Sequence, residues 1–532
     1  MKLKSFIRPF LFLLVVLGGL YVGWQMGLLS KGVEPVEELR EKIVLPVPSS
    51  LETEAPFNPL AGENLAFRFP DGAVEDEVIL TFVDRQAYID FLSALDQAGL
   101  QALGRIDALG VLRLDVSMLS RLKIPLDAVE IGFNFRVSRP TPPLEALPSG
   151  VLNLSPFNQA AAQITGTLAN DGSGVLVAVL DSGLYAHKAF EESEIEEFIL
   201  AGKHLDGAGA EHGTAVASII GGKDGVAPGV DLLVVRVLGE DGLGNSFHAA
   251  QGIIHAVDSG AQLINMSLGL YQDSSLLRHA VQYAHGKGVL LVAAAGNDSY
   301  ASLAYPAAYP EVLSVTAIDA QNLQAGFSNQ SESIDFAAPG VAILTASEEG
   351  KTQLFTGTSA ATPFIAGTLA SLLSRDLQQS PDQVVAELKQ SLNESGALGP
   401  DPLYGDGWVD WGRLSDTGES PLSDLALADI HLPVNAVPGT NVPVEIVIQN
   451  RGNQWLSGGE LTIQIVDGSE LRSIPLRSTR PGEAFSNKIF AQVPASQMDK
   501  PLQIIAFVKT EESIEDNIPE NNMRIIEVKP LP

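Results

Sequence analysis

The sequence predicts an α/β fold built on a doubly wound, mostly parallel sheet, with a small α+β unit before it and an all-β sandwich after it. The central part of this prediction rests on residues 151–416, where short apolar runs alternate with helical stretches. Residues 64–139 show the order β-α-β-β-α-β. Residues 421–532 contain short alternating runs separated by turns, a pattern typical of β-sandwiches. We therefore expect three folded units.

Length and composition describe a soluble globular chain of several domains. The chain has 532 residues, a length that exceeds one ordinary domain. Of these residues, 45% are hydrophobic and 18% are charged, which is typical of a globular chain. Its 33 basic and 64 acidic residues give a formal charge of −31, which argues against a nucleic-acid partner because phosphates would repel the chain. The absence of cysteine excludes disulfides, which fits an exported bacterial protein and equally a reduced cytosolic one.

Residues 1–29 are predicted to direct the chain to the membrane. Lys2, Lys4 and Arg8 precede an apolar run from Phe10 to Leu29, and twenty such residues can span a bilayer. Basic residues before the run and acidic residues after it place the N-terminus in the cytoplasm and the rest outside. No small-x-small cleavage site follows, so we expect an uncleaved signal anchor in the bacterial envelope. A cleaved signal peptide and a secreted protein are the alternative.

Two connecting segments separate the predicted units. Residues 30–63 are acidic and contain prolines, and we expect them to form a linker. Residues 140–150 contain four prolines, which break the strand before them, and an exposed loop of this kind is easily cut by proteases. We expect processing to occur in this loop.

The small unit of residues 64–139 has a clear helix and a clear final strand. Apolar residues within 85–98 recur at the spacing of one helix face. Residues 129–137 alternate apolar and polar side chains, so one face of this strand should be buried and the polar positions, Asn134 among them, should lie on the other.

The central unit should carry helices on both faces of its sheet. Buried parallel strands are predicted at the apolar runs 175–180, 231–237, 262–266, 289–295 and 312–318. Helices are predicted at 246–258 and 275–286 between them. Open α/β sheets carry their sites at the carboxyl ends of the strands, so polar residues that follow these runs are candidates for function.

Ser359 is the first such candidate. It follows the segment Phe355-Thr356-Gly357-Thr358, a strand-like approach and a glycine turn, and it opens an apolar helix. A serine at a helix N-terminus lies among unpaired backbone N–H groups and at the positive end of the helix dipole, which suits a developing oxyanion. An ordinary capped helix start is the alternative when this segment is considered alone.

Asp181 and His212 are the groups that a nucleophilic serine would need. Asp181 ends the run 175–180 at a strand's carboxyl edge, where turn N–H groups keep a carboxylate ionised. His212 stands at the start of a helix within 211–222. Each residue alone fits a structural turn or helix start. Together with Ser359 they are the nucleophile, base and orienting acid of a Ser-His-Asp site.

Five motifs in chain order resemble those of the subtilisin-like serine proteases. They are Asp181-Ser182-Gly183, His212-Gly213-Thr214, Asn265-Met266-Ser267-Leu268-Gly269, Ala293-Ala294-Ala295-Gly296-Asn297 and Gly357-Thr358-Ser359-Ala360-Ala361-Thr362-Pro363. The resemblance covers roughly residues 150–415, and the order Asp, His, Ser separates it from chymotrypsin-like proteases and α/β-hydrolases. Ala360 and Ala215 depart from the family's usual residues, which concerns fine geometry and specificity rather than the reaction class.

The resemblance implies a serine endopeptidase that needs no cofactor for catalysis. Asp181, His212 and Ser359 would form the catalytic triad, and Asn297 with the backbone N–H of Ser359 would form the oxyanion hole. Two alternatives stay open because function resides in the site and not in the fold: a non-catalytic binding protein, and a hydrolase of a non-peptide ester.

The resemblance also implies how a polypeptide substrate would bind. The substrate would add a β-strand between Ser267-Leu268-Gly269 and Gly242-Leu243-Gly244. The first specificity pocket would be lined by Ala294, Ala295 and Gly296, which suggests an apolar side chain.

The flanking units resemble modules that accompany such proteases. Residues 64–139 resemble subtilisin-type propeptides, which implies a folding template and inhibitor acting in cis, with self-cleavage between Val137 and Asn158. A simple spacer is the alternative. Residues 421–532 resemble adhesion-type, CARDB or Ig-like, modules. A structural calcium ion is an option for the acidic loop 511–520. The spacing of its acidic residues matches no calcium-binding loop that we can name, so no ligands are assigned.

Overall fold

The computed structural model describes residues 69–122, 124–125, 127–141, 170–202, 209–415, 420–432, 440–466, 470–492 and 502–528. The chain divides into two compact parts, Met1–Arg68 and Phe69–Pro532, and all described residues belong to the second. The N-terminal, central and C-terminal units described below are regions of this second part. The predicted anchor and the linker of residues 30–63 lie outside the described residues. Within the described part, no helix has the length and apolar character needed to cross a membrane.

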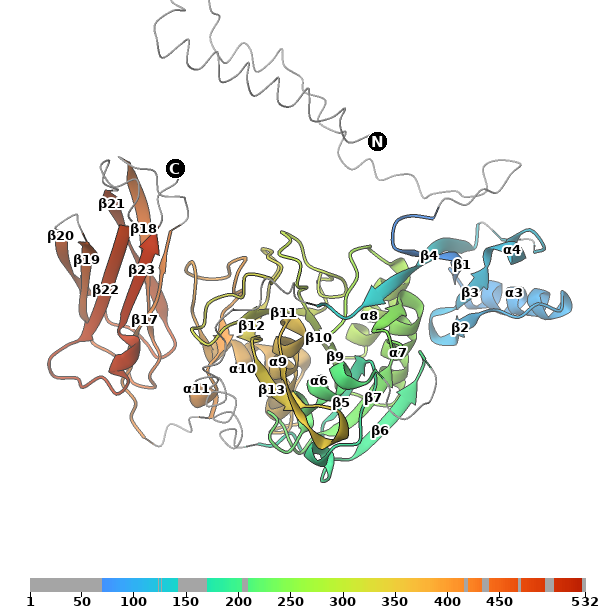
Figure 1. The fold of residues 1–532 in the computed structure, drawn as a ribbon, viewed down its shortest axis with the longest axis horizontal. Coiled ribbons are helices and arrows are strands. Elements are labelled where there is room, and N and C mark those ends of the chain that lie inside the picture. Colours follow the sequence, from blue (N-terminus) through green and yellow to red (C-terminus); the bar gives the residue numbers. More distant parts are fainter. Residues whose placement is uncertain are drawn as a thin grey trace, which may run out of the picture. The chain divides into compact units, whose positions relative to one another are not determined.

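The N-terminal unit, residues 69–141, is a small antiparallel sheet with helices (Figure 1). Its elements are β1 (Ala73–Phe82), α3 (Arg85–Gln97), β2 (Gly104–Ile106), β3 (Val111–Asp115), α4 (Val116–Leu119) and β4 (Val129–Ser138). β1 lies between β3 and β4 and pairs antiparallel with both. The side chain of Asp84 accepts the N–H of Ala87 and so begins α3, because it satisfies one of the helix's unpaired donors.

The central unit, residues 170–415, is organised around a nine-stranded sheet. Its strands are β5 (Leu176–Asp181), β6 (Ile195–Ile199), β7 (Asp231–Arg236), β9 (Leu263–Met266), β10 (Leu290–Ala294), β11 (Leu313–Ile318), β12 (Phe336–Pro339), β15 (Leu392–Asn393) and β16 (Trp408–Val409). The order is β15-β16-β12-β11-β10-β9-β5-β7-β6, and only the pair of β15 with β16 is antiparallel. A mostly parallel α/β sheet is therefore confirmed.

Helices cover both faces of this sheet. They are α6 (Glu211–Gly221), α7 (Ser246–Asp258), α8 (Ser275–Gly286), α9 (Thr358–Leu373), α10 (Pro381–Gln390) and α11 (Trp411–Ser415). Side chains of β5 alternate between two cores: Val177 and Val179 pack with α6 and α9, and Ala178 and Leu180 pack with α7 and α8. This is the doubly wound arrangement, and it explains why the strands are apolar on both faces.

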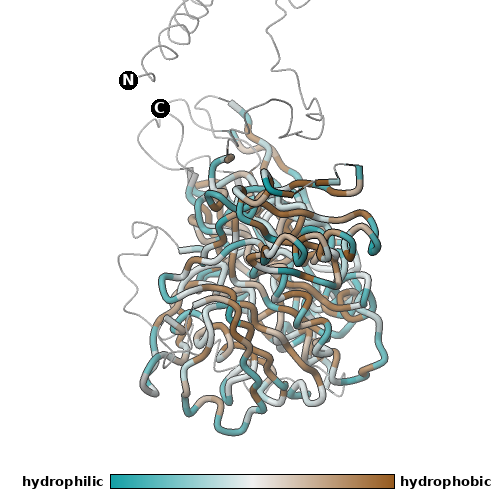
Figure 2. The backbone as a smooth tube through the Cα atoms, turned by 90° about the vertical axis from the view of Figure 1, so that its right-hand side faces the viewer, coloured by the Kyte–Doolittle hydropathy of each residue, from teal (hydrophilic) through white to brown (hydrophobic). Residues whose placement is uncertain are grey.

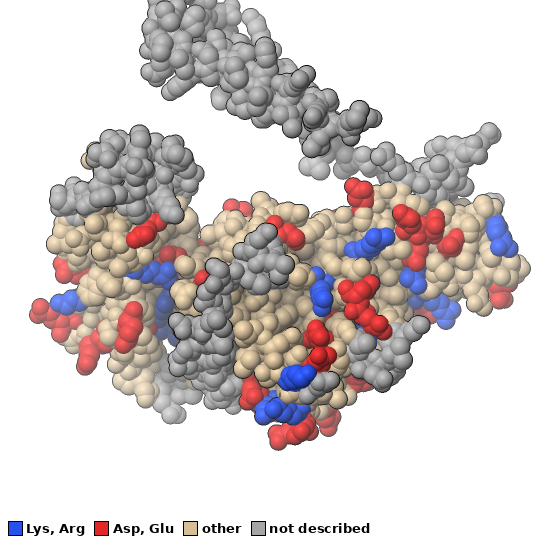
Figure 3. Space-filling view, viewed as in Figure 1, with Lys and Arg blue, Asp and Glu red and all other residues tan. Residues whose placement is uncertain are grey.

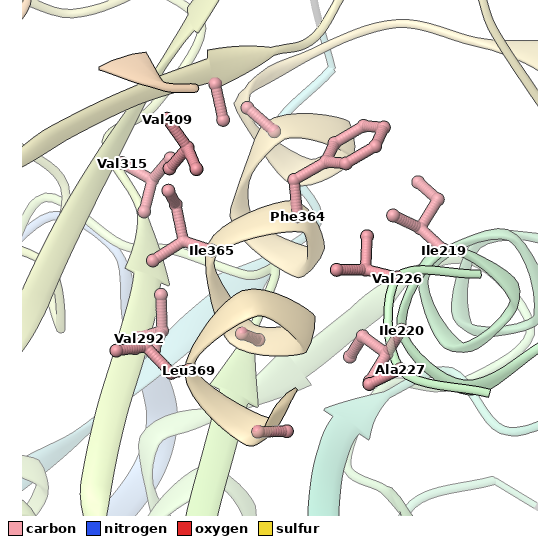
Figure 4. Packing of buried hydrophobic residues seen from close by; sticks show 14 of the residues in the cluster. Ile219, Ile220, Val226, Ala227, Val292, Val315, Phe364, Ile365, Leu369 and Val409 are labelled. Carbon is pink, nitrogen blue, oxygen red and sulfur yellow. The ribbon is translucent and has the colours of Figure 1, made fainter. Parts of the chain in front are cut away.

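α9, the apolar helix predicted after Ser359, is buried on every side. Figure 4 shows Ile365 and Leu369 directed toward the strand residues Val315 and Val292, and Phe364 on the side where Ile219 of α6 lies. A helix surrounded by apolar neighbours cannot shift without opening the core. The start of α9 is therefore a rigid position for a functional side chain.

Two further β-elements complete the central unit. β8 (Leu243–Asn245) lies at the edge of the N-terminal sheet and pairs antiparallel with β4. β13 (Ile343–Ala346) and β14 (Thr352–Phe355) form a hairpin that leads into α9. β4 and β8 thus join the N-terminal unit to the central unit through one continuous sheet.

The C-terminal unit, residues 420–528, consists of two antiparallel sheets. Its strands are β17 (Leu425–His431), β18 (Asn441–Asn450), β19 (Gly459–Val466), β20 (Glu470–Leu476), β21 (Ala484–Gln492), β22 (Leu502–Thr510) and β23 (Met523–Val528). The sheet orders are β17-β18-β21 and β20-β19-β22-β23. Residues from both sheets, among them Ile446 and Ile463, form one apolar core.

Side chains of the C-terminal unit bond to the backbone of the central unit. Gln449 of β18 accepts the N–H of Glu394 at 3.0 Å and donates to the carbonyl of Leu392 at 3.0 Å. Arg451 donates to the carbonyl of Glu394 at 3.3 Å. These bonds hold the segment that follows β15.

Hydropathy and charge follow this architecture. Figure 2 shows hydrophobic segments running through the interior of the described chain and hydrophilic segments in many of its outer loops. On the face drawn in Figure 3, acidic and basic side chains are scattered among wide uncharged areas. The described surface in that view shows no continuous basic patch of the kind that binds nucleic acid.

Candidate active site

Asp181 and His212 form a buried pair. Asp181 is the last residue of β5, and His212 lies in the first turn of α6. Nδ1 of His212 lies 2.8 Å from Oδ1 and 3.0 Å from Oδ2 of Asp181. Oδ1 also accepts the backbone N–H of Ser182 at 2.7 Å, which fixes the carboxylate at the strand end. The contact orients the imidazole, since Asp181 holds the Nδ1 side of the ring.

Two glycines allow the strand end and the helix to meet. A Cβ atom on Gly213 would lie 2.2 Å from the carbonyl oxygen of Gly183, so no larger residue fits there without displacing one segment. Gly183 itself has φ of 97°, which favours glycine. The hydroxyl of Ser182 accepts the N–H of Gly213 at 3.2 Å and ties the two motifs together.

Ser359 is the second residue of α9 and is buried. The preceding turn contains Gly357 with φ of 142°, a conformation that L side chains rarely adopt. Oγ of Ser359 donates to the backbone carbonyl of Ser267 at 3.4 Å. Nε2 of His212 is buried and has no hydrogen-bond partner among the described residues. In this state the serine hydroxyl is thus directed at Ser267 rather than at the histidine.

Phe355, which the sequence marked only as the start of the segment leading to Ser359, is also a neighbour of the Asp181 and His212 pair. Its ring meets the imidazole of His212 edge to face, with 5.1 Å between the ring centroids and an angle of 86°. It belongs to β14, directly before the turn that leads to Ser359. The phenyl ring therefore limits the orientations open to His212.

Asn297 contacts both the start of α9 and the N-terminal unit. Its Oδ1 accepts the backbone N–H and the hydroxyl of Thr358, each at 2.9 Å. Its Nδ2 donates to the backbone carbonyl of Pro140 at 2.9 Å. Because Thr358 holds Oδ1, the NH₂ group points toward Pro140. We call the space between Gly242–Gly244 and Ser267–Gly269, which leads to this amide, the cleft.

The end of β4 and the residue after it lie between the two segments predicted to hold substrate. On one side, Val137 is paired with Gly244 and Ser138 with Leu243, and the N–H of Arg139 donates to the carbonyl of Gly242 at 3.3 Å. On the other side, Ser138 exchanges two backbone hydrogen bonds with Gly269, of 3.0 and 2.8 Å. The predicted substrate segments thus hold a strand of this same chain.

The residues around Gly269 and Gly296 show what surrounds the predicted specificity pocket. Cγ of Pro140 is 4.0 Å from the position of a Cβ on Gly269, and the methyl carbon of Ala304 is 3.0 Å from that position. Ala294 and Ala295 are buried. A Cβ on Gly296 would meet the amide of Asn329 at 2.3 Å and the hydroxyl of Tyr271 at 3.0 Å. Ala304, Asn329 and Tyr271 are neighbours that the sequence motifs did not indicate.

Asn134 is fully buried, which corrects the expectation that it lies on an open face of its strand. Its Oδ1 accepts the N–H of Phe247 at 3.0 Å and the hydroxyl of Ser246 at 3.1 Å, and its Nδ2 donates to Glu77 at 2.6 Å. The expectation was wrong because strand alternation cannot reveal that the polar face packs on the first turn of α7.

The described residues supply no evident metal centre. Within the ranges that the structure covers, no group of three or more His, Cys, Asp or Glu side chains is placed to hold a metal ion. The described residues therefore offer no set of ligands for the calcium ion considered at residues 511–520.

Comparisons with known proteins identify the family to which the chain belongs. Residues 172–407 match the model of the Subtilase family. An alkaline protease of Alkalihalobacillus alcalophilus is 32% identical over 358 residues, which covers 66% of this chain and 91% of that protein. The chain belongs to the subtilase family.

Other subtilases extend the comparison. Subtilisin BL of Lederbergia lenta is 38% identical over 244 residues, covering 45% of this chain and 89% of that protein. A solved structure, a mutant of the protease domain of PatA, is 33% identical, covers 46% of this chain and 95% of that chain, and has a TM-score of 0.42.

Membership in the family fixes the reaction class. This subtilase is a serine endopeptidase, a hydrolase that acts on polypeptides, and it needs no cofactor for catalysis. The predictions of fold type and enzyme class are confirmed at this level.

Proposed function

We propose that this subtilase is made as an exported zymogen and hydrolyses peptide bonds through Asp181, His212 and Ser359. His212 takes the proton of Ser359 as its oxygen attacks the scissile carbonyl, and Asp181 stabilises the imidazolium that forms. His212 then protonates the leaving amine, and water hydrolyses the acyl-enzyme by the same route. The buried contact of 2.8 Å between His212 and Asp181 supports these roles.

The oxyanion hole consists of the Asn297 side chain and the backbone N–H of Ser359. The observation that carries the proposal is the 2.9 Å bond from Nδ2 of Asn297 to the carbonyl of Pro140. A peptide carbonyl lies there against a preorganised donor, next to the start of α9, whose dipole favours negative charge.

A polypeptide substrate binds as an added strand between Gly242–Gly244 and Ser267–Gly269. The backbone bonds to residues 137–139 support this mode, because they use main-chain groups that every peptide has. Leu268 is buried in the core, so its backbone rather than its side chain serves substrate. Ala294, Ala295 and Gly296, with Ala304, shape a pocket for a small or apolar side chain.

Residues 64–139 act in cis as an inhibitor and folding template of the central unit. Support comes from the strand that fills the cleft and from the bonds of Asn134 to the first turn of α7. A parallel sheet with pairings distant in sequence folds slowly, and a preformed antiparallel sheet docked beside it lowers that cost. A spacer would need neither set of contacts.

Export rests on the N-terminal sequence. The basic residues before the apolar run Phe10–Leu29 favour a signal anchor with the enzyme outside the cytoplasm, and cleavage of this segment would instead give a secreted form. The C-terminal unit, a sandwich of the adhesion type, would then also lie outside.

A fluorophosphonate probe tests the catalytic assignment. The probe should label the protein at Ser359, and Ser359→Ala should lose both labelling and peptide hydrolysis while it remains folded. Ser371→Ala is the matched control, because Ser371 lies in the same helix and bonds to the carbonyl of Asn170. Normal labelling of Ser359→Ala would remove this serine from the mechanism. A panel of peptides and esters separates a peptidase from an ester hydrolase, and no labelling at all would favour a non-catalytic binding protein.

A further inference from the structure

The strand in the cleft presents one particular peptide bond to the candidate machinery. The carbonyl of Pro140 receives the Asn297 amide, and Thr141 follows it. If the proposed function holds, the bond between Pro140 and Thr141 is the bond positioned for attack. The ring of Pro140 lies against Gly269, with its Cγ 4.0 Å from the position of a Cβ on that glycine.

The backbone register shows what proline changes at this position. Ser138 and Gly269 exchange both of their backbone hydrogen bonds. In an antiparallel ladder such pairs recur every two residues, so the next pair is residue 140 with Ser267. An ordinary residue at 140 would donate its N–H to the carbonyl of Ser267. Proline has no N–H and cannot do so.

The serine hydroxyl uses the acceptor that proline leaves open. Oγ of Ser359 donates to this same carbonyl of Ser267 at 3.4 Å, while Nε2 of His212 has no partner among the described residues. A hydroxyl has one proton to donate, so a bond to Ser267 excludes the bond to His212 that activates the nucleophile.

We infer that Pro140 is a latch: it lets the N-terminal unit fill the cleft as an intact inhibitor whose presented bond is cleaved slowly. This inference rests on the proposed function and concerns its regulation. The missing N–H does two things at once. It removes one substrate hydrogen bond, and it leaves the Ser267 carbonyl without a donor from residue 140, which makes this oxygen a stronger acceptor for the Ser359 hydroxyl.

The direct test replaces Pro140 in the full-length protein. Pro140→Ala restores the N–H, which donates to one lone pair of the Ser267 carbonyl and so makes that oxygen a weaker acceptor for the Ser359 hydroxyl, which then turns toward His212. Ser359 then forms an acyl bond to residue 140, the bond to Thr141 breaks, and His212 gives its proton to the Thr141 amine before water removes the acyl group. We expect the fragment that begins at Thr141 to appear roughly tenfold faster or more, which corresponds to one regained hydrogen bond.

Three variants control the measurement. Pro140→Val should accelerate cleavage as Pro140→Ala does, because both restore the N–H with different side chains. Pro125→Ala makes the same replacement in the N-terminal unit away from the cleft, and its rate should equal that of the unmodified protein. Adding Ser359→Ala to Pro140→Ala should abolish the cleavage, which shows that the protein's own serine performs it. Intact mass and N-terminal sequencing identify the product.

Synthetic peptides separate the missing N–H from the ring of proline. Peptides matching Val137–Thr141 with proline, alanine or N-methylalanine at position 140 are given to the self-processed Pro140→Ala protein. N-methylalanine lacks the N–H but has the alanine side chain, so its hydrolysis should be as slow as that of the proline peptide.

The two proposals fail in different ways. Equal cleavage of the N-methylalanine and alanine peptides, or equal self-cleavage of Pro140→Ala and the unmodified protein, would overturn the latch while Ser359 still reacts with the probe. Absence of probe labelling in every variant would instead overturn the proposed catalytic site. If Pro140→Ala cleaves itself during preparation, its rate of self-cleavage cannot be followed. The peptide measurement then still tests the role of the missing N–H, because it uses the self-processed protein.

Discussion

The side-chain oxygen of Asn134 accepts the backbone N–H of Phe247 at 3.0 Å, which joins β4 to the first turn of α7. This N–H is one of the donors that a helix cannot satisfy from within. Asn134→Ala should therefore leave it and the Ser246 hydroxyl without their partner at a buried contact. We expect docking of the N-terminal unit to weaken about tenfold, since an unsatisfied buried group costs about 1–3 kcal/mol.

The rate of probe labelling in the unprocessed, full-length protein measures this docking, because the probe competes with the strand in the cleft. Labelling should be about tenfold faster in Asn134→Ala, in line with the expected loss of docking. Gln97→Ala, on the exposed face of α3, is the control and should label at the original rate. Equal rates for both variants would argue against a docking role for Asn134.

Asn297→Ala tests the oxyanion hole. The amide is held by Thr358 and so is preorganised, and its loss should lower kcat by about 10²–10³, as measured for such a donor in this family, with little change in KM. Steady-state kinetics with a short peptide provide both constants. An increase in KM with kcat preserved would assign Asn297 to substrate binding alone.

Gly213→Ala tests the approach of the Asp181 and His212 motifs. The added methyl group would meet the Gly183 carbonyl at 2.2 Å and force the two segments apart. Displacement of about 1 Å at a catalytic group can cost about 10²-fold in rate, so peptidase activity should fall by at least that factor.

Gly286→Ala is the matched control for Gly213→Ala. Gly286 ends α8, and a methyl group there meets no atom within 4 Å, so this variant should keep its activity and gain about 0.5–1 kcal/mol of stability. Thermal unfolding and peptide hydrolysis of both variants check the pair. Full activity in Gly213→Ala would mean that the contact is not needed.

Glu394→Gln should change how stability depends on pH. Burial raises the pKa of the Glu394 carboxyl from 4.5 to about 7, and Asp401 and Asp406 add to this effect. The folded state thus keeps a proton that the unfolded chain releases near pH 4.5. The stabilisation is complete below that pH and is lost as the pH rises through 7. One pKa unit is about 1.4 kcal/mol, so the loss is at most about 3 kcal/mol.

Midpoints of thermal unfolding between pH 5 and 8 measure this effect, in a Ser359→Ala background that prevents self-digestion. The midpoint of the protein with Glu394 should fall across this range more than that of Glu394→Gln. Glu332→Gln alters an exposed carboxylate and should retain the original slope. Parallel curves for Glu394 and its glutamine variant would contradict the assignment.

Strands buried on both faces could be predicted because their sequences are continuously apolar. β5, Leu176–Asp181, differs by one residue at each end from the predicted run 175–180. β6, Ile195–Ile199, was missed because it lies at the sheet edge and carries Glu196 and Glu197 on exposed positions. β12, Phe336–Pro339, was missed because two of its four residues are alanine and one is proline, which are weak strand formers. Edge position and composition thus limit what periodicity reveals.

Local motifs indicated the candidate triad, whereas long-range partners could not be deduced. Asp181, His212 and Ser359 each stand at an element boundary that the sequence marks. The contact of Asn297 with Pro140 joins residues 157 positions apart, and no local pattern encodes it. The burial of Asn134 likewise depends on α7. Tertiary packing decides such positions, and only the structure places them.

The hydrogen bonds of Gln449 bear on how this enzyme can be shortened or recombined. A version ending near residue 416, the predicted end of the central unit, loses the Gln449 side chain that now accepts the N–H of Glu394, whereas the carbonyl of Leu392 keeps its bond from Arg413 at 3.0 Å. Exchange of the C-terminal module for another should therefore supply a new acceptor for the Glu394 N–H. The module is therefore part of the enzyme's working framework in any recombinant design, and not a detachable accessory.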